Sequence, residues 1–79
     1  MISLAQFEAL EKDMEYEEVC VVLGGGGELL SSENAQIEPG IQVMSVVTDL
    51  YEWRNEDGSW IRLMFNQKRL NDAAQEGLS

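Results

Sequence analysis

The chain contains no histidine, and Cys20 is its single cysteine among 79 residues. One cysteine cannot form an internal disulfide, and the usual zinc and haem ligand sets cannot be assembled without histidine or more cysteines. Cys20 lies in the apolar run Val19 to Val22, with no basic residue beside it to activate the thiol. We therefore expect Cys20 to be a small core residue, and we expect no cofactor.

Basic residues are scarce. Five Lys and Arg stand against fifteen Asp and Glu, so the formal net charge is −10. This charge repels phosphate backbones and anionic lipid heads, and we expect neither direct nucleic-acid binding nor membrane binding. It is compatible with ordinary solubility, and also with attraction to a basic protein or mimicry of the charge of a nucleic acid.

Long apolar runs are also missing. The first residues lack the basic region and apolar stretch of a secretory signal, and no segment approaches the roughly 18 apolar residues of a membrane helix. A cytoplasmic location is the expectation. With 44% hydrophobic and 25% charged residues, the composition is typical of a folded protein, and this length supports one domain with a thin core.

Two short helices are predicted in the first third of the chain. Ser3 as N-cap with Gln6 three residues later forms a capping box, and Ile2 with Phe7 forms a hydrophobic staple. A second helix is expected from Glu15 or Tyr16 to Leu23, although its β-branched residues also suit a strand. Gly24 supplies a stop signal, and packing beside the first helix favours the helix.

The four glycines from Gly24 to Gly27 do not indicate a phosphate-binding loop. They follow a helix rather than precede one, and no Gly-Lys-Ser/Thr sequence comes after them. We interpret them as a flexible exit from the second helix into a strand.

Strands are predicted in the remainder of the chain. Residues 29–35 form a short one, Pro39-Gly40 marks a turn, and residues 41–53 form one long strand or two halves bent near residues 48 and 49. A half-buried strand follows at residues 61–65, and a tight turn at residues 66–68 leads to a last strand that fades into a weakly ordered tail, residues 72–79. The whole chain, residues 1–79, is expected to be one domain.

The strongest turn signal lies at Asn55 to Ser59, between two apolar runs that together form a hairpin from Tyr51 to Phe65. A four-residue loop would place Trp53 and Trp60 opposite each other on one face. A five-residue loop would place Trp53 opposite Ile61 instead, with Trp53 facing the helices. In that second register, the face turned away from the helices carries Trp60, Arg62 and Met64.

Several segments of the chain together carry a resemblance to known proteins. They are Ile2 to Phe7, Met14, Glu17 to Val19, Leu23-Gly24, Tyr51, Trp53, Asp57 to Ser59, Phe65, Leu70, Ala74-Gln75 and Gly77-Leu78. In this order they resemble the small helix-helix-sheet module of β-lactamase-inhibitor-like (BLIP-like) proteins of bacteria and, more distantly, outer-membrane assembly lipoproteins of the SmpA type. The resemblance covers nearly the whole chain, with departures at Asp13, Glu15 and the Gln67-Lys68 turn. It implies an α+β fold and, for some members, protein binding through an exposed sheet face.

Six acidic residues crowd the two predicted helices, but they lack the ligand order of a calcium loop, and so does the Asn55 to Gly58 segment. The sequence contains no recognisable set of residues for nucleophilic catalysis, because histidine is absent and no serine occupies a nucleophile-elbow sequence. We expect a solvated acidic surface and no catalytic or metal-binding residues. The six are Glu8, Glu11, Asp13, Glu15, Glu17 and Glu18.

The resulting expectation is an α+β fold with two short N-terminal helices packed on one face of a three- or four-stranded antiparallel sheet. The leading functional hypothesis is a non-enzymatic protein-binding or regulatory module, with Trp60, Arg62 and Met64 as the contact residues. A homodimer formed through sheet edges or faces is the alternative, because association stabilises a domain with a thin core. An acidic metal-binding protein or an enzyme ranks third.

Overall fold

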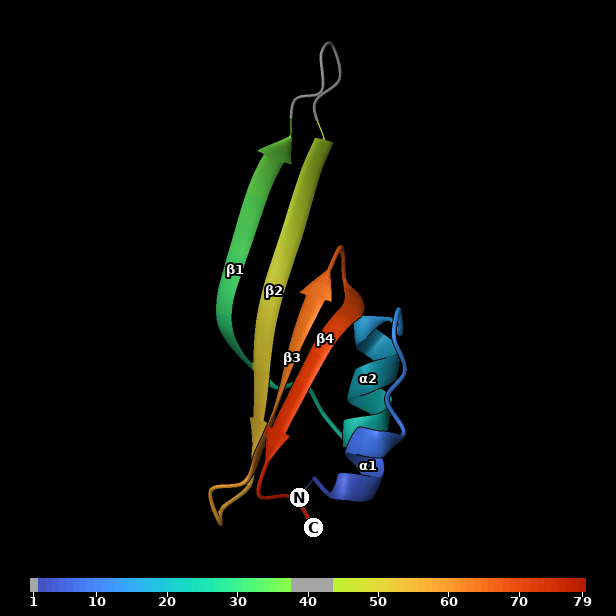
Figure 1. Cartoon of the computed structure of the whole chain (residues 1–79), viewed down its shortest axis with the longest axis vertical. Coiled ribbons are helices and arrows are strands. Elements are labelled where there is room, and N and C mark those ends of the chain that lie inside the picture. Colours follow the sequence, from blue (N-terminus) through green and yellow to red (C-terminus); the bar gives the residue numbers. More distant parts are fainter. Residues whose placement is uncertain (1, 38–43) are drawn as a thin grey trace.

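In the computed structural model, residues 2–37 and 44–79 are described, with the backbone alone at 35–37 and 44–46. These residues form a four-stranded antiparallel sheet with strands in sequence order, preceded by two short helices (Figure 1). The prediction of an α+β fold is confirmed. The elements are α1 (Leu4–Glu8), α2 (Tyr16–Leu23), β1 (Glu28–Ile37), β2 (Met44–Arg54), β3 (Trp60–Asn66) and β4 (Arg69–Glu76).

Helix α1 begins with the predicted capping box. The Ser3 hydroxyl accepts a hydrogen bond from the Gln6 backbone N–H at 3.3 Å, and Gln6 Oε1 accepts one from the Ser3 N–H at 2.8 Å. Gln6 also donates from Nε2 to the Val22 carbonyl at 3.0 Å. Gln6 therefore caps its own helix and ties it to the last turn of α2.

Helix α2 confirms the helical interpretation of the β-branched run and ends at Gly24, which adopts a left-handed conformation with φ 79°. Val19 and Leu23, four residues apart on one helical face, are buried, whereas Val21 on another face is 82% exposed. Packing of the first face against the sheet outweighs the weak strand preference of valine.

The segment between the helices lies along β4. The Asp13 N–H donates to the Leu70 carbonyl at 2.8 Å, the Leu70 N–H donates to the Met14 carbonyl at 2.8 Å, and the Tyr16 N–H donates to the Lys68 carbonyl at 2.9 Å. Asp13 makes this path possible with a positive φ of 68°, which aspartate tolerates better than most residues. The first part of the β4 edge is thereby covered by the chain itself.

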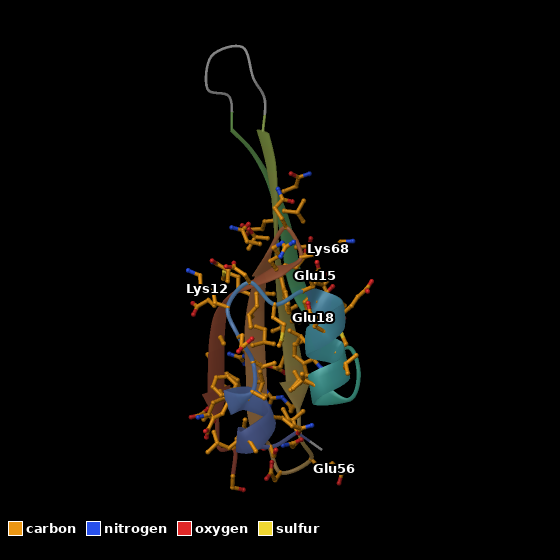
Figure 2. All side chains as sticks on the ribbon, turned by 90° about the vertical axis from the view of Figure 1, so that its right-hand side faces the viewer. Lys12, Glu15, Glu18, Glu56 and Lys68 are labelled. Atoms are coloured by element: carbon orange, nitrogen blue, oxygen red, sulfur yellow. The ribbon has the colours of Figure 1, made fainter. Side chains whose placement is uncertain are left out.

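The core lies between the helices and one face of the sheet, and both helices are on that side in Figures 1 and 2. On β3 the buried positions alternate as predicted, with Ile61, Leu63 and Phe65 fully covered. The rest of the buried cluster is Ile2, Val19, Leu23, Trp53 and Leu70.

The last strand is longer than expected. The strand was predicted to fade from Asp72 onward, but β4 pairs with β3 through Glu76, and Leu78 packs against the core. The polar side chains of this segment gave no strand pattern in the sequence. A strand at the edge of a sheet is held by backbone hydrogen bonds and needs little apolar surface. The predicted tight turn before it is confirmed, with Gln67 and Lys68 both at positive φ (54° and 65°), as two-residue hairpin loops favour.

The β1–β2 hairpin extends beyond the rest of the sheet. Pairing of β2 with β3 stops at Thr48 opposite Asn66, while pairing of β1 with β2 continues to Ile37 opposite Met44. A two-stranded ribbon therefore projects past the β3–β4 turn (Figure 1), and the molecule measures 49 × 20 × 17 Å. β1 is longer than the predicted segment 29–35, and β2 is a single strand rather than two halves. The predicted Pro39-Gly40 turn lies outside the described residues.

Candidate interaction surface

The hairpin loop holds five residues, Asn55 to Ser59. Trp53 is paired with Ile61 and Arg54 with Trp60, so the five-residue alternative is the one that forms. Since side chains alternate across a strand, Trp53 points toward the helices and is only 7% exposed, whereas Trp60 lies on the opposite face.

Hydrogen bonds within the loop maintain this length. The Asn55 N–H donates to the Ser59 carbonyl at 2.8 Å, and Asp57 Oδ1 accepts from both the N–H (2.9 Å) and the hydroxyl (2.5 Å) of Ser59. These bonds from Ser59 lower the pKa of Asp57 below its ordinary value. Gly58 completes the loop at φ 93°, a conformation that a residue with a Cβ rarely adopts.

The glycine segment after α2 encloses Trp53. The indole Nε1 donates to the Gly25 carbonyl at 2.8 Å, and a Cβ on Gly27 would lie 2.7 Å from the Trp53 ring. The segment is thus the helix exit that was predicted, with a packing requirement that the sequence alone did not reveal.

The face of the sheet turned away from the helices is called the open face below. On β3 it carries Trp60, Arg62 and Met64 at alternate positions, as predicted for the five-residue loop, and all three are partly exposed. Opposite them on β2 stand Arg54, Glu52 and Leu50. The structure therefore brings the three predicted contact residues together on one surface.

Glu52 organises this surface, although it was not among the predicted contact residues. Its side chain is only 8% exposed, and it accepts hydrogen bonds from Arg62 Nε at 2.8 Å and from Arg54 Nε at 3.0 Å. These bonds, from Arg54 first and Arg62 second, lower the pKa of Glu52 from 4.5 to about 2. The Arg62 guanidinium in turn lies 4.1 Å from the centroid of the Trp60 ring.

A signal for this cluster was present in the sequence. Glu52 and Arg54 are two residues apart and so share one face of β2, and the five-residue loop places Glu52 opposite Arg62. Without the loop length, however, the same residues could equally have faced the helices.

On the helix side, a hollow of about 420 Å³ lies between the start of α2 and the sheet. Tyr16, Tyr51 and Phe65 form its floor, with Tyr16 4.7 Å from Tyr51 and 5.3 Å from Phe65 between ring centroids. The hydrogen bond with the Cys20 thiol, followed by burial, raises the pKa of Tyr16 to about 12. The three rings pack chiefly on one another, so the floor is an extension of the core.

Charged residues line the rim of this hollow. Figure 2 shows Glu15 and Lys68 close together at the start of α2, and Glu15 forms an ion pair with Arg69 at 3.6 Å. Within residues 2–37 and 44–79, no group of three or more His, Cys, Asp or Glu side chains is arranged to hold a metal ion. Cys20 is partly buried and packs against the core.

No protein-family model, curated protein or solved structure matches this chain. The resemblance to β-lactamase-inhibitor-like proteins therefore stays a prediction. Across the part of the chain that the structure describes, no helix is long and apolar enough to cross a membrane.

Proposed function

We propose that the protein is a non-enzymatic, cytoplasmic protein-binding module that contacts its partner through the open face. The observation that carries the proposal is the Glu52 cluster. A carboxylate only 8% exposed holds two guanidinium groups in place on a face that the helices do not cover.

The cluster lowers the entropic cost of binding. A free arginine side chain loses about 1.5–2 kcal/mol of rotamer freedom when a partner immobilises it. Here Arg62 is already held by the Glu52 carboxylate and the Trp60 ring, while 41% of its side chain stays exposed. Such preorganised Arg and Trp side chains are typical of the energetically dominant residues of interfaces.

The same geometry indicates the chemistry of the partner. Arg54 donates to Glu52 from Nε and, at 3.4 Å, from Nη2, whereas Arg62 donates from Nε. The two arginine side chains remain 51% and 41% exposed. Guanidinium N–H groups bind carboxylates well, and Met64 and Leu50 add apolar surface next to them. We expect a partner that presents an acidic group beside an apolar side chain.

The described side chains favour binding over catalysis. Ser59 is buried, and its hydroxyl is engaged by Asp57 and Asn55 in the hairpin loop. The Tyr16 hydroxyl, with a pKa of about 12, holds its proton too strongly to act as a base near neutral pH. Both groups serve the fold.

Affinity capture from the native cytoplasm tests the proposal. We expect wild type to recover a partner that Trp60→Ala and Arg62→Ala recover at least tenfold less. Arg69→Ala is the matched control, since Arg69 is a similarly exposed arginine (58%) that pairs with Glu15 and not with Glu52. Equal recovery by all four proteins would refute binding through the open face.

A further inference from the structure

The outer edge of β1 is the longest uncovered strand edge among the described residues. β1 pairs with β2 on one side only, along Glu28 to Ile37. The opposite edge of the sheet, β4, is partly covered by the segment before α2, through the bonds of Asp13 and Met14 to Leu70. An uncovered edge presents unpaired N–H and C=O groups that can pair with another strand.

From Ser31 to Ile37 this edge lacks most of the features that protect edge strands. The irregularity in β1 lies before this stretch, between Leu29 and Ser31, so the stretch itself pairs with β2 in regular register. It contains one charged residue, Glu33, and no proline. Edge strands that remain solitary usually carry several charges, a proline or a bulge.

The distribution of charge favours a second copy of the chain as the partner here. Residues 29–48 contain two acidic residues, Glu33 and Glu38, and no basic ones, while the chain as a whole has a net charge of −10. Two copies that meet along this ribbon keep most of their carboxylates apart. Antiparallel pairing also places the two helix-bearing ends at opposite ends of the assembly.

The size of the exposed surface agrees with association. The accessible surface is 5382 Å², against about 4,800 Å² for a compact monomer of this mass. The radius of gyration is 14.2 Å, against about 11.6 Å for a compact chain of this length. The excess of about 600 Å² is similar to the area that each partner buries in the smaller specific interfaces.

We propose that two copies pair through their β1 edges, antiparallel and about a two-fold axis, to form one continuous eight-stranded sheet. Only one register pairs all seven residues from Ser31 to Ile37, and it is centred on Asn34. In that register Asn34 of one copy is paired with Asn34 of the other. Glu33 is paired with Ala35 of the second copy, so the two Glu33 residues do not stand directly opposite each other. The assembly leaves the open face of each copy unobstructed.

Isosteric charge substitutions test the edge. Sedimentation velocity of the wild-type protein over a wide concentration range should show a monomer–dimer equilibrium. Asn34→Asp places two like charges directly opposite each other and should raise the dimer dissociation constant about two- to fivefold. Asn71→Asp makes the same change in net charge at an exposed position of β4 and should leave the constant within experimental error of the wild type.

Charge complementation tests the two-fold axis. Asn34→Lys alone should weaken the dimer as Asn34→Asp does, whereas an equimolar mixture of the two variants should dimerise at least as tightly as wild type, since Asp then faces Lys. Amide hydrogen exchange in Ser31 to Ile37 should slow as the protein concentration rises.

Three results would overturn the proposal: a monomer at every concentration, equal weakening by the Asn34 and Asn71 variants, or a mixture that dimerises no better than its components. Trp60→Ala should leave the dimer intact, so failure of this inference is distinguishable from failure of binding through the open face.

Discussion

The Asn55 side chain forms two hydrogen bonds with the backbone of Ile2, 53 residues earlier in the chain. Oδ1 accepts from the Ile2 N–H at 2.8 Å, and Nδ2 donates to the Ile2 carbonyl at 2.8 Å. The amide side chain thus pairs with both the N–H and the carbonyl of one residue, as the backbone of a neighbouring strand would. These bonds fix the start of the chain immediately before the α1 capping box. The hairpin loop thus positions the N-terminal helix as well as the open face.

Asn55→Ala should destabilise the protein by about 2–3 kcal/mol, because the backbone groups of buried Ile2 lose their partners. For a domain of this size the melting temperature should fall by about 10–20 °C in a thermal scan. Asn55→Asp keeps the acceptor for the Ile2 N–H but loses the bonds that Nδ2 donates to the Ile2 carbonyl and to the Ser59 hydroxyl. Its stability should lie between those of the wild type and Asn55→Ala. Glu56→Ala, at an exposed neighbour, should change stability by less than about 0.5 kcal/mol, and a loss equal to that of Asn55→Ala would contradict the assigned role.

Gly27→Ala should cost about 2–3 kcal/mol, since the added Cβ would lie 2.7 Å from both the Glu52 carbonyl oxygen and the Trp53 ring. Gly24→Ala is the comparison. At Gly24 a Cβ meets no atom within 4 Å, and only the left-handed conformation, worth about 1 kcal/mol, opposes it. Urea unfolding should rank Gly27→Ala as the less stable variant, and the reverse order would show that the glycine segment does not enclose Trp53.

Glu52 should titrate near pH 2, as measured by the NMR shift of its side-chain carboxyl carbon. Because the folded-state pKa lies below the ordinary value of 4.5, folding is favoured by the ionised form. The contribution is fully present above pH 4.5 and is lost as the pH falls toward 2. The difference in stability between wild type and Glu52→Gln should therefore shrink over that range, and a difference that stays constant would contradict the arginine contacts.

Tyr16 should ionise near pH 12, well after an exposed tyrosine. Its raised pKa means that folding favours the protonated hydroxyl, so this contribution is complete below pH 10 and is lost as the pH rises to about 12. Ultraviolet titration of the wild type should show a late phenolate transition that Tyr16→Phe removes. A late transition that persists in Tyr16→Phe would contradict its assignment to Tyr16.

The two tryptophans should report the loop length. Trp60→Phe leaves the buried Trp53, with emission at short wavelength and weak quenching by acrylamide, while Trp53→Phe leaves the partly exposed Trp60, with redder and more quenchable emission. Circular dichroism of both variants controls for folding. Similar spectra from the two folded variants would mean that the tryptophans share one face, as in the four-residue loop.

The sequence by itself determined the features that depend on residues close together in the chain. The Ser3–Gln6 capping box, the stop at Gly24, the Gln67-Lys68 turn and the alternation of Ile61, Leu63 and Phe65 each follow from local backbone preferences and side-chain spacing. These signals were sufficient to predict an α+β fold with a three- or four-stranded antiparallel sheet.

Tertiary structure alone decided which face each side chain of the hairpin occupies. The sequence was compatible with two loop lengths, and a change of one residue would reverse every side chain of the paired strand. The choice depends on long-range contacts: Asn55 with Ile2, and Trp53 with the glycine segment after α2. Those contacts bury Trp53 and leave Trp60, Arg62 and Met64 beside Glu52 on the open face, because side chains alternate between the two faces of a strand.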